Sequence, residues 1–349
     1  MHRSFHFLRQ IRPVVTSSRS PNLQTALGIA IRSSHNESDN LDYLSEQSQK
    51  TKNFAAEQNR RYHKLQKSLE PIKRIVLNEI GEHSQEGGCT VPESVGSHLY
   101  QYRYEDGANL PSLFRCRTPA SYQPEKEWQG AKRRMTKVLD LVEEADETGF
   151  VSVDAISVTR DGRYLGFLKD ASGEEFFDLH LRDQEESKEE SLPDVSGFAW
   201  VKDKRGDRFV VYTTPDELMR PWRVCVHKVG SDADNDVTIL EDHGPSNFLK
   251  IHLSKDGKYV FLNSNSKVSS EVHILYCDDP WNEPQLLLSR QQEIQYFVSH
   301  RHGKFYMVTN RCDGEYNIMY ADAGSLPLQE EHLEVGSSSV YLKNYLHHS

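Results

Sequence analysis

The sequence contains no apolar run near the roughly 20 residues that a membrane-spanning helix needs. It has no sustained basic patch, and its formal net charge is −10, which argues against a nucleic-acid partner. The five cysteines are scattered and none forms a C-x-x-C pair: Cys89, Cys116, Cys225, Cys277 and Cys312. Their odd number and wide spacing argue against a disulfide framework or a zinc site, and indicate a reducing compartment.

Helical periodicity is also scarce. After about residue 95 it is confined to a charged connection from about 132 to 147. With 36% hydrophobic, 10% aromatic and 27% charged residues, the composition is that of a soluble globular protein. A chain of 349 residues can bury a large core, as one repeat domain or as two ordinary domains.

The first 36 residues contain no acidic side chain, because the first one is Glu37. Arginines are spread through this segment, at Arg3, Arg9, Arg12, Arg19 and Arg32. An Arg-rich, acid-poor amphipathic segment is typical of an organelle import sequence, so residues 1–36 predict mitochondrial targeting rather than plastid targeting. The alternative is a disordered tail with chance arginines, which would leave the protein in the cytoplasm. Residues 37–53 are interpreted as a polar linker.

Residues 54–82 predict a helical arm. Apolar side chains recur at steps of three and four and form one stripe: Tyr62, Leu65, Leu69, Ile72, Val76 and Ile80. Pro71 is expected to begin a second helix, since proline is tolerated at the first helical position. Such a stripe has to be buried against another surface.

Two stretches of the chain are similar to each other. Residues 159–183 read "TRDGRYLGFLKDASGEEFFDLHLRD" and residues 254–279 read "SKDGKYVFLNSNSKVSSEVHILYCDD". Each begins with an Asp-Gly turn, continues into a strand rich in aromatic and aliphatic residues, and closes on an acidic residue. This pattern predicts a recurring β-hairpin in which Asp-Gly serves turn geometry alone.

Five glycine-led strands extend this similarity along the chain. Intervals of 66, 44, 51 and 46 residues separate Gly96, Gly162, Gly206, Gly257 and Gly303. Further strand signals lie between them, such as "FAWVKD" from Phe198 and "WRVCVHKVG" from Trp222, which gives each unit about four strands. A period of roughly 40 to 50 residues predicts an all-β fold of propeller blades over residues 90–349. An all-β sandwich is the alternative, and the His and Trp-Asp signature of WD40 blades is missing.

The ordered motifs resemble the N-terminal part of the prolyl oligopeptidase family of serine peptidases, nearest to oligopeptidase B and the prolyl endopeptidase-like proteins. The helical arm is followed by "YQYRYEDGANLPSLFRCR", "VSVDAISVTRDGRYLGFLKDASGEE", "SGFAWVKD", "SSEVHILYCDDPWNEP" and "VSHRHGKFYMVTN". The resemblance implies a seven-bladed propeller that caps an α/β-hydrolase domain, with the helical arm wrapped around that domain. It also implies activity on short peptides in the full-length family.

The catalytic part of that family has no counterpart among these residues. A serine nucleophile of the α/β-hydrolase fold lies on a G-x-S-x-G elbow, and this sequence has none. The nearest stretches, residues 244–248 and 336–340, each lack the second glycine. No residue of the Ser-Asp-His triad can therefore be assigned, and we expect the chain to be inactive alone.

The propeller itself is expected to be incomplete. Residues 340–349, "VYLKNYLHHS", resemble the first strand of a sixth blade, so about five of seven blades are present. An open ring exposes a long strand edge. We therefore expect the chain to pair with a partner, either the missing hydrolase domain in cis or that of a paralogue. The alternative function is a stand-alone propeller that binds another protein without catalysis.

Three groups of side chains in the sequence are candidates for chemistry. His300 and His302 lie at a predicted turn without a carboxylate or cysteine at ligand spacing, so they predict a solvated turn rather than a metal site. The charged run 182–191 predicts a solvent loop. Four neighbouring carboxylates, Glu143, Glu144, Asp146 and Glu147, predict a solvated helix end rather than the acid pair of a propeller glycosidase. No catalytic, cofactor or metal-binding residue is predicted.

Overall fold

The computed structural model describes residues 49–83, 88–105, 107–108, 110–118, 135–145, 149–312, 314–324, 326, 328 and 332–335. The predicted targeting segment 1–36, most of the linker 37–53 and the predicted strand at 340–349 lie outside the described residues. The chain divides into two compact units. One contains the long helix α2 and the other contains the β-sheets.

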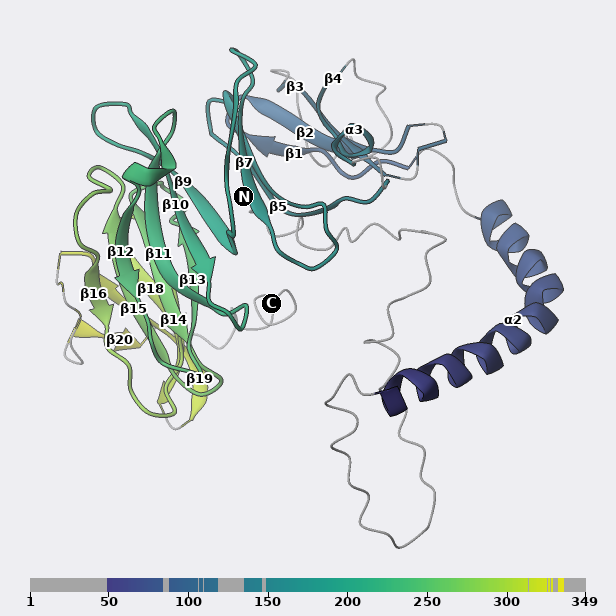
Figure 1. Ribbon diagram of the computed structural model, residues 1–349. Coiled ribbons are helices and arrows are strands. Elements are labelled where there is room, and N and C mark those ends of the chain that lie inside the picture. The colour runs from purple at the N-terminus through teal and green to yellow at the C-terminus, as the bar shows by residue number, and fades with distance from the viewer. Residues whose placement is uncertain are drawn as a thin grey trace, which may run out of the picture. The chain divides into compact units, whose positions relative to one another are not determined.

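Helix α2 (Gln49–His83) is a single helix of 35 residues. It begins inside the segment predicted as linker, and it contains Pro71, so the prediction of a second helix starting at Pro71 is wrong. Proline has no N–H to donate to the preceding turn and its ring crowds that turn, which bends a helix without always ending it. Figure 1 shows α2 bent along its length. The predicted apolar stripe is exposed, with Tyr62 52%, Leu65 57% and Ile72 58% accessible.

The other unit contains five four-stranded antiparallel sheets, each a simple meander, which we call blades 1 to 5. Blade 1 is formed by β1 (Glu93–Val95), β2 (His98–Arg103), β3 (Ser112–Arg117) and β4 (Thr136–Asp140). Blade 2 is formed by β5 (Ser152–Val158), β6 (Tyr164–Asp170), β7 (Asp178–Asp183) and β8 (Glu189–Leu192). Blade 3 is formed by β9 (Gly197–Lys202), β10 (Arg208–Pro215), β11 (Pro221–Lys228) and β12 (Val237–Glu241).

Blade 4 is formed by β13 (Phe248–Leu253), β14 (Tyr259–Asn265), β15 (Ser270–Tyr276) and β16 (Gln285–Leu288). Blade 5 is formed by β17 (Tyr296–Arg301), β18 (Lys304–Cys312), β19 (Glu315–Asp322) and β20 (Glu334–Val335). Two short helices, α3 (Leu141–Glu144) and η3 (Ala233–Asn235), lie in connections. The expected all-β fold with about five propeller blades is confirmed.

The expected helical connection at 132–147 is wrong in its described part. Strand β4 pairs with β3, with Ser112 opposite Asp140, and only one helical turn, α3, follows. The side chain of Asp140 accepts a hydrogen bond from the backbone N–H of Val142 and so caps that turn. Buried Leu139 holds the strand in the core, which overrides the local charge pattern.

The second strands of blades 2, 3 and 4 are buried on both faces, rather than on one. In β14 every residue from Tyr259 to Ser264 is buried. Successive side chains of a strand point to opposite faces, and here each face meets a different neighbouring blade. Phe167 of β6 packs with blade 1, whereas the adjacent Leu168 packs with blade 3.

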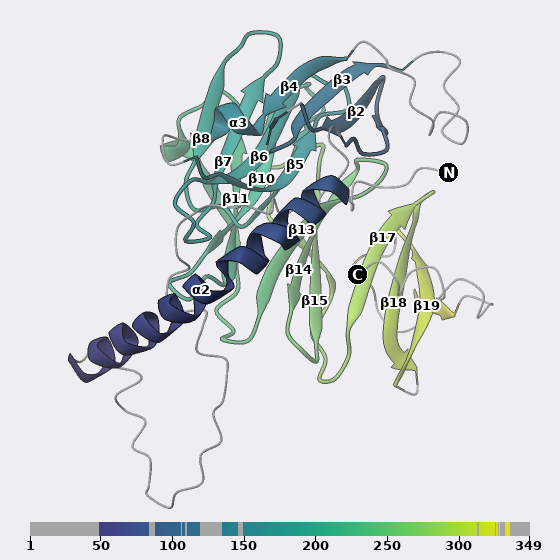
Figure 2. The ribbon, with the colours of Figure 1, turned by 90° about the vertical axis from the view of Figure 1, so that its right-hand side faces the viewer.

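Four apolar clusters fill the four junctions between successive blades. One cluster joins blades 1 and 2, the next joins blades 2 and 3, and the others join blades 3 and 4 and blades 4 and 5. Strand β9 lies against both β5 and β13, so the first strands of adjacent blades are neighbours. Figure 2 shows β13, β14 and β15 beside β17, β18 and β19. Successive sheets of the same topology therefore pack face to face, as the sequence repeat predicts for propeller blades.

The five repeat glycines all occupy the turn between the first and second strands of a blade. Each has a positive φ: Gly96 at 56°, Gly162 at 76°, Gly206 at 96°, Gly257 at 75° and Gly303 at 76°. This conformation is strained for other residues, which explains why the repeat is led by glycine.

Candidate functional site

The Asp-Gly turns of blades 2 and 4 have the same internal hydrogen bonds. The hydroxyl of Thr159 donates to Asp161 at 2.6 Å, and the hydroxyl of Ser254 donates to Asp256 at 2.8 Å. Each hydroxyl also accepts the backbone N–H of the first residue of the following strand, Tyr164 or Tyr259, at 3.0 Å. These bonds fix the turn that begins the second strand.

Both aspartates also bind the following blade, so the prediction that the Asp-Gly pairs serve turn geometry alone is wrong. Asp161 forms an ion pair with Arg208 of blade 3. Asp256 contacts Nδ1 of His300 in blade 5 at 2.9 Å. Burial opposes ionisation of Asp256, but the hydrogen bond from Ser254 and the nearby His300 lower the pKa of Asp256 below its ordinary value.

His300 is therefore not at a solvated turn. It lies in β17, is 1% exposed and packs edge-on against Tyr259 and Phe305. His302 does lie in the exposed turn that follows, with a positive φ of 51°. The two histidines lie in different environments, because His300 is inside β17 whereas His302 lies beyond the end of that strand at Arg301.

The turns between first and second strands meet at one end of the propeller, which we call the turn end. Arg160 of blade 2 donates to the carbonyl of Lys255 in blade 4, although these blades are not neighbours. Such a contact requires both turns to lie near the axis about which the blades rotate. Arg115 of blade 1 donates to the carbonyl of Gly162 at 2.6 Å. In the described blades the turn end is therefore cross-linked between blades.

The predicted carboxylate cluster has a structural role where the structure describes it. Glu144 contacts Lys169 at 3.0 Å and Arg182 at 2.7 Å, both from blade 2. Glu143 is exposed on α3, whereas Asp146 and Glu147 lie outside the described residues. These two ion pairs connect α3 to blade 2.

The charged run 182–191 is a solvent loop only at its centre. Arg182 contacts Glu144 and Glu189, and Asp183 is buried and bound by Arg163 at 2.7 Å. Hydrogen bonds from His180 and Arg182 lower the pKa of Glu189 to about 2, against the effect of burial. Alternating strand positions place His180 and Arg182 on the face that meets blade 1, beside Phe167, and Asp183 on the other face.

A buried histidine joins blades 2 and 3. His227 of β11 is 1% exposed, and its Nδ1 lies 2.7 Å from Asp236, while its Nε2 lies 3.6 Å from Glu190 of β8. Asp236 also accepts a hydrogen bond from the hydroxyl of Tyr212 at 2.8 Å. Burial opposes the charged imidazole, but the two carboxylates raise the pKa of His227 above its ordinary value. Sequence inspection missed this cluster, because its members are 9 to 46 residues apart.

We expect His227 to make stability depend on pH. A raised pKa in the folded state stabilises the fold fully below the ordinary histidine pKa, near 6.5, and this contribution is lost as pH rises through the folded-state value. Urea unfolding of the native chain should therefore show a loss of stability as pH rises above about 6.5 that His227→Gln abolishes. Glu190→Gln should reduce the loss, and an unchanged slope in both variants would contradict this role.

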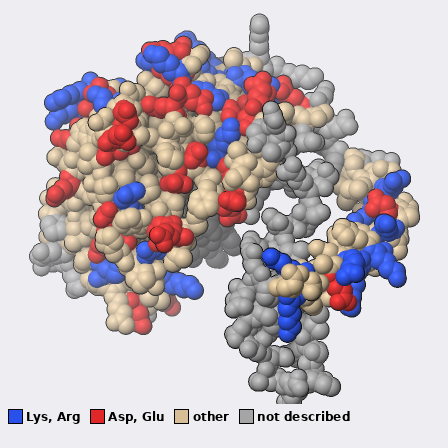
Figure 3. Space-filling model, viewed as in Figure 1, with Lys and Arg blue, Asp and Glu red and all other residues tan. Residues whose placement is uncertain are grey.

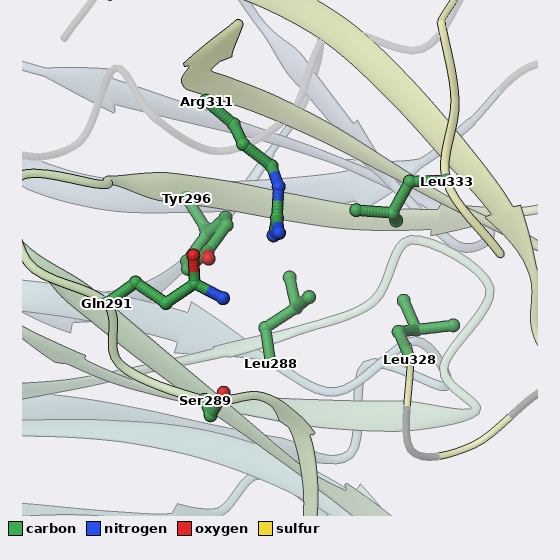
Figure 4. Close-up of a pocket in the computed structure, with 7 residues that line it drawn as sticks. All are labelled: Leu288, Ser289, Gln291, Tyr296, Arg311, Leu328 and Leu333. Atoms are coloured by element: carbon green, nitrogen blue, oxygen red, sulfur yellow. The ribbon is translucent and has the colours of Figure 1, made fainter. Parts of the chain in front are cut away.

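One pocket lies at the end of the junction between blades 4 and 5, and has a volume of about 230 Å³. Its polar lining comes from Ser289, Gln291, Tyr296 and Arg311. Its apolar lining comes from Leu288, Leu328 and Leu333. Figure 4 shows Arg311, Tyr296 and Gln291 pointing into the same space, with Leu288 and Leu328 on the opposite side. Sequence inspection missed this pocket as well.

The second face of blade 5 is open. Phe297 of β17 is 57% exposed and pairs across the sheet with Val308, while Tyr306 is 37% exposed and lies beside Tyr320. These side chains alternate with the buried ones that pack on blade 4. Figure 3 shows acidic and basic residues interspersed over the sheets, whereas several basic residues gather on α2.

The described residues contain no cluster of three or more potential metal ligands. Among them there is also no helix whose length and apolarity would let it cross a membrane. Ser246, at the centre of one near match to the nucleophile motif, is exposed in the turn before β13. The other near match, residues 336–340, lies outside the described residues.

Known proteins contain the same series of blades. Residues 25–332 match the family model described as prolyl oligopeptidase, N-terminal beta-propeller domain. Protease 2 from Moraxella lacunata is 28% identical over 265 residues, 74% of this chain and 37% of that protein. The prolyl endopeptidase-like protein of Rattus norvegicus is 31% identical over 161 residues, 45% of this chain and 22% of that protein.

A solved structure has the same fold. Oligopeptidase B from Leishmania major superposes with a TM-score of 0.67 at 21% identity, covering 78% of this chain and 38% of that chain. The matched part thus spans less than half the length of these relatives. What is common to all of them is the blade region.

Proposed function

Because the chain belongs to the prolyl oligopeptidase family, as its N-terminal propeller domain, we propose that it controls access to the catalytic domain of a serine peptidase that acts on short peptides. The observation that carries this proposal is the match over residues 25–332, which includes blades 1 to 4 and the first three strands of blade 5. The names of the relatives, Protease 2 and oligopeptidase B, support peptide hydrolysis as the reaction class.

The proposed chemistry is acyl transfer by a catalytic domain that is not among these residues. A serine hydroxyl attacks the peptide carbonyl, and a histidine first accepts its proton and then delivers it to the leaving amine. Water then hydrolyses the acyl enzyme. No described residue of this chain is assigned to these steps.

The role proposed for the propeller is to exclude large substrates. Its turn end is cross-linked by Arg160, which bonds blade 2 to blade 4, and by the ion pair of Asp161 with Arg208. A narrow opening admits an extended peptide and rejects a folded domain. Sequestering the reaction in this way is a common function of the parts that cover an active site.

We expect the chain alone to remain unlabelled by a fluorophosphonate probe, because its sequence contains no G-x-S-x-G nucleophile motif. Joined to the hydrolase portion of a relative such as Protease 2, it should be labelled with one probe per chain. The joined protein should also cleave a short peptide much faster than an unfolded protein, whereas the hydrolase portion without the propeller should not discriminate between them.

Ser246→Ala is the matched control for the labelling experiment, since Ser246 is exposed and lies in the nearest match to the nucleophile motif. Stoichiometric labelling of the chain alone, abolished by this substitution, would overturn the assignment of catalysis to another domain. Equal cleavage of short and long substrates by the joined protein would overturn the access role.

A second function, a stand-alone binding module, is favoured by the exposed apolar residues. The side chains of α2 and the second face of blade 5 expose aromatic and aliphatic groups of the kind that protein interfaces bury. The proposed partner is the hydrolase domain of a paralogue. A chain that stays bound to a full-length relative through gel filtration, without altering its preference for short peptides, would support this function over access control.

A further inference from the structure

The pocket between blades 4 and 5 contains a buried polar group without a hydrogen-bond acceptor. Tyr296 is 1% exposed, and its hydroxyl has no hydrogen-bond acceptor among the residues that the structure describes, because the neighbouring Arg311 side chain can only donate. Buried hydroxyls are almost always hydrogen-bonded, and leaving one unsatisfied costs about 1–3 kcal/mol. Burial raises the pKa of Tyr296, although the neighbouring Arg311 opposes the shift, so the hydroxyl keeps its proton and remains a donor. The pocket therefore presents a donor that lacks an acceptor.

The rest of the lining determines which acceptor fits. Arg311 is the single charged residue among those that line the pocket, and its guanidinium extends into the cavity beside Tyr296 (Figure 4). Arginine binds carboxylates through two parallel N–H donors. The Tyr296 hydroxyl and the Gln291 amide can add further donors from the same side.

Three leucines form the other wall, and they exclude a ligand that is polar throughout. A phosphate or sulfate ion would lose its hydration against Leu288, Leu328 and Leu333 without gaining a second cation. An aliphatic tail would instead bury apolar surface there, which contributes about 0.8 kcal/mol per methylene group. The volume of about 230 Å³ exceeds the roughly 30 Å³ that one water molecule occupies.

We propose that this pocket is a binding site for a small aliphatic carboxylate, whose oxygens accept hydrogen bonds from Arg311 and Tyr296 and whose hydrocarbon part lies on the leucines. The site is separate from the turn end, and the proposal does not depend on the proposed access role. An amino-acid or short-peptide carboxyl terminus with an aliphatic side chain belongs to this ligand class.

The test uses the full chain and hexanoate, with binding followed by titration calorimetry or ligand-observed NMR. Hexanoate should bind saturably, hexanamide at least tenfold more weakly because it lacks the charge, and acetate weakly because it lacks the tail. Tyr296→Phe should weaken hexanoate about tenfold, the fold-change that corresponds to a lost hydrogen bond to a charged group. Arg311→Gln should abolish the preference for hexanoate over hexanamide.

Tyr306→Phe is the matched control, because Tyr306 lies on the opposite, open face of blade 5. It should leave hexanoate binding unchanged. Tyr296→Phe removes an unsatisfied hydroxyl and so should fold at least as stably as the native chain, which separates a binding defect from misfolding. Absence of saturable binding, equal binding of hexanamide, or unchanged affinity in Tyr296→Phe and Arg311→Gln would each overturn the proposal.

Discussion

Replacing Gly96 by alanine is expected to destabilise the fold by about 2–5 kcal/mol, the combined cost of a left-handed residue and of overpacking. Gly96 has a φ of 56°, and a Cβ atom there would lie 1.8 Å from the carbonyl oxygen of Arg160. That oxygen belongs to the turn of blade 2, so the backbones of two blades touch at this glycine. The contact can be relieved only by moving the blades apart.

Gly303→Ala is the control that separates backbone strain from the clash. Gly303 occupies the same position in blade 5 with a φ of 76°, but its Cβ would meet no atom within 4 Å. Its expected cost is only about 1 kcal/mol. Urea unfolding followed by tryptophan fluorescence measures both, and equal effects of the two substitutions would refute close packing at the turn end.

Phe261→Ala is expected to cost about 3–5 kcal/mol, as other truncations of buried phenylalanines do. Phe261 of β14 is fully buried in the cluster that joins blades 4 and 5. Its ring stacks on His252 at a centroid distance of 4.9 Å and meets Phe305 edge-on at 6.1 Å. Its removal leaves a cavity between two blades that are each held in place by further contacts, so the site cannot collapse to fill it.

Phe297→Ala serves as the control for Phe261→Ala. Phe297 is on the adjacent blade but faces away from this junction and is 57% exposed. Its truncation should change the free energy of unfolding by no more than about 0.5 kcal/mol. Thermal or urea unfolding compares the two, and a large effect of Phe297→Ala would mean that the second face of blade 5 is buried in this chain.

The sequence predicted the blades because each of them repeats the same local requirement. A glycine is needed where the first and second strands connect, and aromatic or β-branched residues are needed in the strand that follows, so the period is visible in the residues themselves. The resemblance to the prolyl oligopeptidase family added the family and the expectation of a catalytic domain elsewhere. The match to the family model confirms the family.

Contacts between blades were harder to predict. The sequence predicts a solvated turn at His300, because no carboxylate or cysteine lies at ligand spacing, yet His300 is buried against Asp256, 44 residues earlier. Likewise, the Asp-Gly pairs gave no sign of their second role as links to the following blade. Sequence neighbours determine a turn, but the partner of a side chain depends on which strands the fold brings together.

The pocket illustrates the same limit. Tyr296 is the first residue of β17, and Arg311 lies near the end of β18, 15 residues later. Leu328 and Leu333 belong to the connection before β20. None of these residues forms a motif, and their chemistry arises only when they face a common cavity.

The amino-acid sequence by itself determined the period of the propeller, the position of every repeat glycine and the absence of a nucleophile motif, since these depend on local backbone geometry and on residue identity. Only the tertiary structure decided that the second strands of blades 2, 3 and 4 are buried on both faces, that His227 lies between two carboxylates, and that Tyr296 lacks a hydrogen-bond acceptor. Those properties depend on distances across blade junctions, which are set by the packing of residues far apart in the chain.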